Sequence, residues 1–198
     1  MNEAPAGAGR LLCVGGAPGA GKTTVGALVA RAARAAVVDL DSVTTALVEA
    51  VAAGLGEDAD LDAPRYAALR GARYACLDAV VGDCLRAGSD VVAVAPFTRE
   101  AADARAWRDR GRALGAASVT LVWLDLDPGV AAARAAARGA PRDLAKAGRP
   151  PATAAAAPTP APSAASVDRG GFDLVLDAAA GLPDELAARV LARWAPAA

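Results

Sequence analysis

Histidine is absent from this chain of 198 residues. The commonest general base of enzymes and the commonest transition-metal ligand are therefore both missing. This absence excludes Ser-His-Asp hydrolysis, Cys-His nucleophilic catalysis and histidine-ligated zinc hydrolysis. Any acid or base must be a carboxylate, a lysine or water. Phosphoryl transfer tolerates this restriction, because it depends mainly on positioning, magnesium and fixed positive charge, with at most a carboxylate to orient the attacking hydroxyl.

Long apolar runs, strong net charge and paired cysteines are also missing. No segment approaches the roughly 20 apolar residues that are needed to cross a bilayer. The formal net charge is -1 and the pI is near 5.5, so no global positive field attracts nucleic acid. Three cysteines without CxxC spacing suit reduced thiols. We therefore expect a soluble, cytoplasmic protein, monomeric or homodimeric, with neither a membrane nor nucleic acid as a partner.

The clearest pattern present is a glycine loop, G-A-P-G-A-G-K-T at residues 16–23, which matches the phosphate-binding pattern G-x-x-x-x-G-K-[ST] in full. An apolar run of strand type precedes it at 10–14, and a helical pattern follows at 24–34. Such a loop lets backbone N–H groups and the positive end of a helix dipole converge on phosphates. Lys22 is predicted to reach the β and γ phosphates, and Thr23 to ligate magnesium. The expected nucleotide-binding residues are Gly16, Ala17, Pro18, Gly19, Ala20, Gly21, Lys22, Thr23 and Thr24.

Strand and helix patterns alternate along the rest of the chain. Further strands are expected at 35–40, 89–96, 118–124 and 172–176, and helices at 43–53, 63–87, 99–114, 128–139 and 183–194. Continuous apolar strands separated by helices predict one α/β domain over residues 1–198, with a five-stranded parallel sheet covered on both faces. The stretch at 147–166 is rich in proline and low in complexity. We expect it to be mobile, either as part of a lid at about 140–166 or as a disordered linker.

The second expected strand ends in D-L-D, which places two carboxylates at the carboxyl end of a strand, where open α/β sheets bind their ligands. Alternation along the strand would send Asp39 and Asp41 the same way. Because a hydroxyl attacking a γ-phosphoryl group benefits from a nearby carboxylate, Asp41 is the candidate base. The alternative is that Asp41 only caps the helix that begins near Val43. The third strand ends in V-A-P and lacks an acidic Walker B residue, which leaves Asp39 as the carboxylate on the magnesium side.

Together, the glycine loop and the D-L-D sequence resemble the P-loop small-molecule kinases, including gluconate, shikimate and adenylylsulfate kinases; chloramphenicol phosphotransferase is also similar here. The resemblance implies a three-layer α/β fold with a lid, and ATP with Mg²⁺ as the phosphoryl donor. It also implies that Asp39 supports magnesium and that Asp41 orients or deprotonates the acceptor hydroxyl. The implied activity is transfer of the γ-phosphoryl group to a hydroxyl of a small molecule.

Arginines form the third pattern, because Arg134, Arg138 and Arg142 are spaced so that a continuing helix would present them on one face. Guanidinium groups bind phosphate oxygens bidentately and stabilise charge on the transferring group. R-x-x-x-R in this place resembles the lid of these kinases. Arg134 and Arg138 are therefore the candidate catalytic and nucleotide-binding residues of a lid, with a solvated helix face as the alternative.

Recognition of the acceptor is the least legible part of the sequence. Arg70 and Arg99 are the predicted substrate-binding residues, and both would favour an acidic or phosphate-bearing acceptor. The other candidates near the expected acceptor are Arg65, Tyr66, Arg73, Phe97 and Thr98. Two alternative functions stay open. One is a nucleotide-hydrolysing switch or regulatory ATPase in which Asp41 positions water, and the other is a phosphotransferase that acts on an antibiotic or is a protein toxin of the zeta type.

Overall fold

The computed structural model describes residues 8–54, 67–127, 129–131, 133, 134 and 169–195. Strands and helices alternate along this part of the chain, as the apolar runs predict. The strands are β1 (Leu11–Gly16), β2 (Ala36–Asp39), β3 (Val91–Val94), β4 (Val119–Asp125) and β5 (Leu174–Asp177). The helices with defined bounds are α1 (Lys22–Ala33), α2 (Leu40–Gly54), α3 (Ala67–Arg86), α4 (Ala104–Ala113) and α7 (Pro183–Trp194), with two short 3-10 helices, η2 (Glu100–Ala102) and η4 (Arg169–Gly171).

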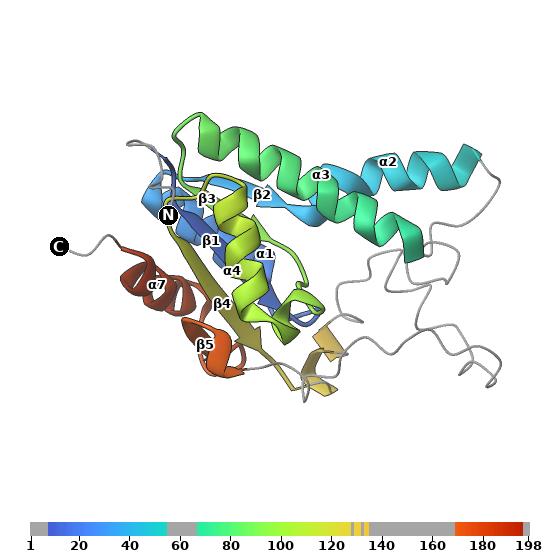
Figure 1. Ribbon diagram of the computed structural model, residues 1–198. Coiled ribbons are helices and arrows are strands. Elements are labelled where there is room, and N and C mark those ends of the chain that lie inside the picture. Colours follow the sequence, from blue (N-terminus) through green and yellow to red (C-terminus); the bar gives the residue numbers. More distant parts are fainter. Residues whose placement is uncertain (1–7, 55–66, 128, 132, 135–168, 196–198) are drawn as a thin grey trace.

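The five strands form one parallel sheet in the order β2-β3-β1-β4-β5 (Figure 1). Every residue of β1 and of β3 is buried, which is why these strands are continuous apolar runs rather than alternating ones. The prediction of a five-stranded parallel sheet is therefore confirmed. The chain leaves β1 toward β2 and β3 on one side, whereas β4 and β5 lie on the other. The loop after β1 thus stands at a topological switch point, where α/β sheets bind ligands.

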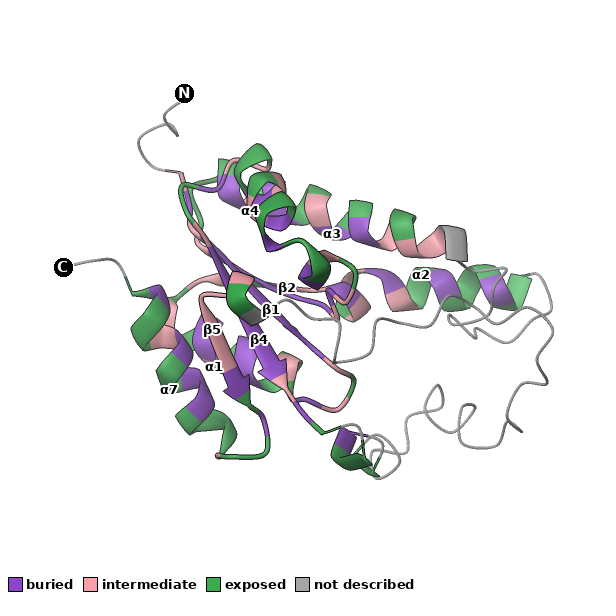
Figure 2. Cartoon of the chain, turned by 60° about the horizontal axis from the view of Figure 1, so that its bottom comes forward, coloured by how far each residue is buried: buried purple, intermediate pink, exposed green. Residues whose placement is uncertain are grey.

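Helices cover both faces of the sheet and give the predicted three layers (Figure 1). Helices α1 and α7 pack against one face, and α3 and α4 pack against the other. Figure 2 shows this for α7, which turns buried residues toward the sheet and exposed residues away from it. Burial of these apolar stripes is the main stabilising contribution to such a fold. The core between the sheet and helices α1 and α7 contains Val25, Val29, Leu186 and Val190. The core between the sheet and helices α3 and α4 contains Leu77, Val81, Leu85 and Trp107.

The second strand is shorter than the sequence predicts, and this changes the setting of the D-L-D sequence. Strand β2 ends at Asp39, and α2 begins at once with Leu40. The carboxylate of Asp39 accepts hydrogen bonds from the backbone N–H groups of Asp41 and Ser42, at 2.9 and 3.4 Å. Asp39 is therefore the residue that caps α2. Asp41 lies in the first helical turn, so strand alternation does not relate the two carboxylates.

The predicted helix at 99–114 is also divided. Residues Glu100–Ala102 form η2, and α4 starts only at Ala104. Asp103 separates them, with a backbone that is not helical and a side chain that accepts a hydrogen bond from the N–H of Ala106 at 2.9 Å. An aspartate at this position begins a new helix, because its carboxylate replaces a missing backbone partner.

Several predictions fall on residues outside the described ranges: Arg65, Tyr66, Arg138, Arg142 and the proposed lid at about 140–166. Within the described part of the chain, no helix has both the length and the apolar character needed to span a bilayer.

Candidate active site

The glycine loop connects β1 to α1 and has the backbone conformation that its sequence predicts. Gly16, Gly19 and Gly21 have φ angles of 148°, 86° and 81°, values that residues other than glycine rarely adopt. Space is also restricted, because a Cβ on Gly16 would lie 2.5 Å from the carbonyl oxygen of Leu124 and one on Gly19 would lie 2.8 Å from that of Ala131. Helix α1 begins directly after Gly21 without a side-chain cap. Its first N–H groups are therefore directed into the loop, as an anion site requires.

Lys22 and Thr23 follow the loop in the first turn of α1. The Nζ atom of Lys22 donates a hydrogen bond to the carbonyl oxygen of Ala17 at 2.8 Å, so the ammonium group lies across the loop. The hydroxyl of Thr23 donates to Asp39 Oδ2 at 2.8 Å. Since the other oxygen of Asp39 caps α2, this one carboxylate joins the phosphate loop to the start of α2. Thr23 Oγ1 and Asp39 Oδ2 are hard oxygen donors of the kind that Mg²⁺ prefers.

Asp41 lies beyond Asp39 and forms an ion pair with Arg73 of α3, at 2.7 Å between Oδ1 and Nη2. The Nε of Arg73 donates to the hydroxyl of Thr44 at 2.8 Å, and Thr44 in turn donates to the carbonyl oxygen of Leu40 at 2.6 Å. The carboxylate is the accessible member of the pair, with 44% of the Asp41 side chain exposed against 14% for Arg73. The arrangement fixes Asp41 in place and leaves it accessible.

Arg70 lies one helical turn before Arg73 and is also paired. Its Nη2 lies 3.0 Å from Glu100 Oε2 and 3.3 Å from Oε1, and its guanidinium carbon lies 4.3 Å from the centroid of the Tyr74 ring. Arg99, the other predicted substrate residue, is exposed in the segment between β3 and η2. The structure thus brings Arg70, Arg73 and Asp41 together through α2 and α3, and it places Arg99 at an exposed position.

The segment after β3 is held by Tyr74. Its hydroxyl accepts a hydrogen bond from the backbone N–H of Phe97 at 3.0 Å, and burial is the main cause that raises the pKa of Tyr74 to about 12. Phe97 has a φ of 48°, a conformation that costs about 1–3 kcal/mol in a residue with a bulky side chain. One residue earlier, the carbonyl oxygen of Pro96 accepts from the N–H of Gly16 at 3.4 Å. The strained segment therefore spans from the phosphate loop to α3.

Arg134 lies at the opposite side of the glycine loop. Residues 129–131, 133 and 134 are helical, and Arg134 Nη1 donates to the carbonyl oxygen of Ala178 at 3.3 Å, in the turn between β5 and α7. The backbone of Ala131 is the group that closely approaches Gly19. This short helical segment thus lies against both the phosphate loop and the turn after β5.

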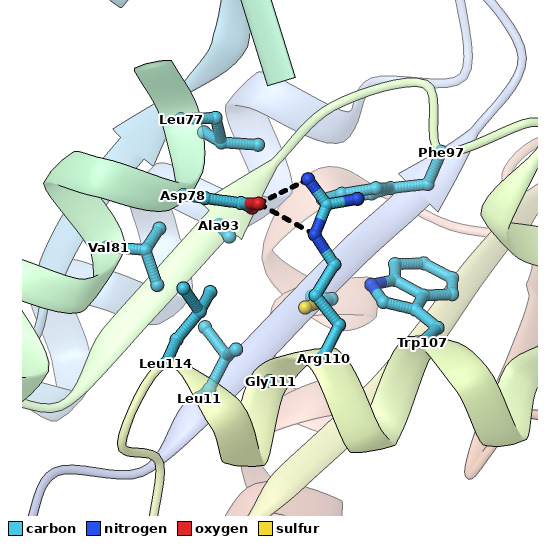
Figure 3. Close-up of a pocket in the computed structure, with 11 residues that line it drawn as sticks. Leu11, Leu77, Asp78, Val81, Ala93, Phe97, Trp107, Arg110, Gly111 and Leu114 are labelled. Carbon is cyan, nitrogen blue, oxygen red and sulfur yellow. Dashed lines mark hydrogen bonds and ion pairs between the residues drawn. The ribbon is translucent and has the colours of Figure 1, made fainter. Parts of the chain in front are cut away.

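A small pocket lies away from this site, between α3, α4 and the start of β1 (Figure 3). Its polar lining is the ion pair of Asp78 with Arg110, and the pKa of Asp78 is raised chiefly by burial. Cys13 also lines the pocket, and burial raises the pKa of its thiol to about 12. A thiol that stays protonated has little nucleophilic reactivity, so we assign this pocket to the packing of α3 and α4 against the sheet.

Two residues of this site, Glu100 and Tyr74, carry no functional signal in the sequence. Glu100 follows the predicted residue Arg99 directly, but its partner Arg70 lies 30 positions away. Tyr74 lies four residues after Arg70 and was assigned no functional role from the sequence. The helical spacing of Arg70 and Tyr74 is the one signal that could have linked them, because residues four apart share a face of a helix.

A family model described as an AAA domain matches residues 11–156, which is more than half of the sequence. The chain belongs to this AAA-domain family. The matched region includes β1 to β4 and therefore the glycine loop, Asp39 and Asp41. No curated protein sequence matches this AAA-domain protein.

Solved structures resemble this AAA-domain protein over nearly its whole length. An APS kinase from Mycobacterium tuberculosis in complex with AMPPNP and APS has a TM-score of 0.59 at 20% identity, covering 94% of this chain and 97% of its own. A gluconokinase from Sinorhizobium meliloti has a TM-score of 0.54 at 19% identity, covering 93% and 90%. The tunicamycin resistance protein of Deinococcus radiodurans has a TM-score of 0.57 at 15% identity, covering 96% and 97%. At these identities the likeness shows the fold, and the predicted P-loop kinase fold is confirmed.

Proposed function

We propose that this protein is a kinase that transfers the γ-phosphoryl group of ATP, with Mg²⁺, to a hydroxyl group of a small molecule. The observation that carries the proposal is the Thr23–Asp39–Asp41 arrangement, in which one carboxylate joins the phosphate loop to the helix that carries the candidate base. The kinases of similar fold named above support the same reaction class. The absence of histidine from the sequence is compatible with it. We expect it to work in the cytoplasm, where ATP and Mg²⁺ are abundant.

The chain's own residues would divide the work of transfer. Backbone N–H groups of residues 16–23 would hold the phosphates, and Lys22 would leave Ala17 to neutralise the β and γ oxygens. Thr23 and Asp39 would hold Mg²⁺, which supplies charge neutralisation and orientation of the phosphates. Arg134 would cover the nucleotide from the side of the β5–α7 turn, with Arg138 as the second predicted lid arginine.

Asp41 would orient the acceptor hydroxyl and accept its proton. Its carboxylate is accessible and is fixed by Arg73, so it can receive a hydrogen bond from a hydroxyl group without reorganising. Because phosphoryl transfer needs little covalent chemistry from the protein, this positioning is most of what a carboxylate can contribute.

The test of the proposed function is ADP release from ATP and Mg²⁺, measured with and without a panel of sugars, sugar acids, nucleosides and aminocyclitols. We expect release to rise with one class of acceptor and a phosphorylated product to appear in equal amount. Release that no acceptor changes, but that a protein partner raises, would instead indicate a nucleotide-hydrolysing switch. If antibiotics are added to the panel and only one of them is phosphorylated, the result would indicate the antibiotic-type phosphotransferase.

Replacing Gly19 with alanine is expected to weaken ATP binding at least about tenfold, because the left-handed backbone and the carbonyl of Ala131 both oppose a Cβ there. Titration calorimetry with a non-hydrolysable ATP analogue measures the effect. Gly115→Ala is the matched control, since Gly115 also has a positive φ, of 100°, but nothing lies within 4 Å of its added Cβ. The control should lose roughly 1 kcal/mol of stability and keep its nucleotide affinity. Equal affinity in both variants would contradict the assignment of the loop.

A further inference from the structure

The face of the protein next to Asp41 carries charges that are already matched in pairs. We call the residues Asp41, Arg70, Arg73, Tyr74 and Glu100 the acceptor-side face. Two of its members are cations and two are carboxylates, and each cation is bonded to one carboxylate. The face is therefore close to neutral, although its sequence appears rich in arginine.

Two nitrogen atoms of the Arg73 guanidinium donate hydrogen bonds within the protein. Its Nη2 bonds to Asp41 and its Nε bonds to Thr44, and only 14% of the side chain is exposed. An anion that took the Nη2 donor of Arg73 would have to compete with Asp41, which the proposed function needs in place. Hydrogen bonds to charged groups contribute enough that losing one lowers affinity roughly tenfold or more.

Arg70 is restricted in the same way. Glu100 accepts from its Nη2 with both oxygens, and the ring of Tyr74 covers one side of the guanidinium. Only 12% of the Glu100 side chain is exposed, so a Glu100 carboxylate that lost Arg70 would remain partly desolvated without compensation. An isolated Arg70 would favour an acidic or phosphate-bearing acceptor. Here, however, Glu100 already balances the charge of Arg70.

We propose that the acceptor-side face selects an uncharged, polyhydroxylated acceptor over an acid or a phosphate ester of the same skeleton. This inference rests on the proposed function. A hydroxyl group can both donate and accept hydrogen bonds. It can therefore bond to a paired carboxylate or a paired guanidinium group while both ion pairs stay closed. An anionic acceptor must in addition approach the negative polyphosphate of ATP beside two arginines, Arg70 and Arg73, whose charges are already paired.

The experiment compares neutral and acidic acceptors that keep the same skeleton and the same hydroxyl groups: gluconamide with gluconate, galactonamide with galactonate, and galacturonamide with galacturonate. We expect the neutral member of each reacting pair to have the higher kcat/KM for ADP release, by roughly tenfold. Preference for the acidic member in the reacting pairs would overturn the inference and leave the proposed kinase function standing. If no acceptor raises ADP release, the proposed function is wrong and the inference falls with it.

A variant of Glu100 tests whether charge, rather than the shape of the acceptor-side face, sets the preference for the neutral acceptor. Glu100→Gln leaves Arg70 without its carboxylate, so the ratio of neutral to acidic kcat/KM should shift toward the acid about tenfold. Asp83→Asn is the matched control, because Asp83 is exposed and pairs with Arg86 on the surface of α3; it should leave the ratio unchanged. The double variant Arg70→Gln with Glu100→Gln removes both charges and should restore the preference for the neutral acceptor. An unchanged ratio in Glu100→Gln, or an acid preference in the double variant, would overturn the inference.

Discussion

Replacement of Lys22 with alanine is expected to lower the rate of phosphoryl transfer by about a thousandfold or more. The reason is electrostatic, because the ammonium group is the fixed positive charge that the loop places beside the transferring phosphoryl group. Its Nζ lies 2.8 Å from the carbonyl oxygen of Ala17, so the side chain crosses the glycine loop. Single-turnover transfer with saturating ATP measures the chemical step separately from ATP binding.

The matched control for this prediction is Arg86→Ala, which removes one positive charge from the exposed surface of α3. It should change neither the rate nor the melting temperature beyond a small amount, because exposed ion pairs contribute little. Lys22→Ala should also fold normally, since the carbonyl of Ala17 can bond to water when the ammonium is removed. Undiminished transfer in Lys22→Ala would show that the loop does not act on the phosphoryl group.

The order of strands and helices could be predicted because each strand of the parallel sheet is a continuous apolar run between clear helical patterns. Strands β1 and β3 are buried throughout and were recognised for that reason. The boundary after β2 was harder, because Asp39, Asp41 and Ser42 are all good helix caps in sequence. Only the hydrogen bonds of the folded chain show that Asp39 takes this role.

Part of the candidate site could be predicted from neighbouring residues, whereas the rest depends on residues that are far apart in the sequence. The glycine loop is local, so its turn, its positive φ angles and the start of α1 all follow from a single pattern of residues. The ion pairs of Asp41 with Arg73 and of Arg70 with Glu100 join residues 32 and 30 positions apart. No spacing rule reaches that far, because such pairs depend on how α2, α3 and η2 pack.

The strained backbone of Phe97 belongs to the non-local part. A left-handed conformation at a buried aromatic residue has no signal in the sequence, and it persists only where surrounding contacts outweigh its cost. Here the hydroxyl of Tyr74 and the rings of Tyr74 and Trp107 supply those contacts, with ring centroids 5.8 and 4.5 Å from that of Phe97. The segment after β3 is thereby kept rigid between the phosphate loop and the acceptor-side face.

Asp41→Asn is expected to lower kcat by a factor of at least about a hundred while ATP affinity survives. Asparagine is nearly the same size, and its amide oxygen can still accept the hydrogen bond from Arg73, so the position of α2 should be retained. What disappears is a carboxylate that can take the proton of the acceptor hydroxyl. The measurement is steady-state transfer to the acceptor identified in the panel, together with calorimetric titration of an ATP analogue.

Two companion variants distinguish proton acceptance by Asp41 from its bond to Arg73. Arg73→Gln removes the ion pair but keeps the Asp41 carboxylate, and it should raise the KM for the acceptor more than it lowers kcat. Asp83→Asn makes the same chemical change at an exposed position and should leave both constants unaltered. If Asp41→Asn keeps full turnover, Asp41 is not the base. If Asp41→Asn and Arg73→Gln instead lose kcat equally, the ion pair rather than proton acceptance by Asp41 is what the reaction needs, because both variants remove that pair and only one removes the proton acceptor.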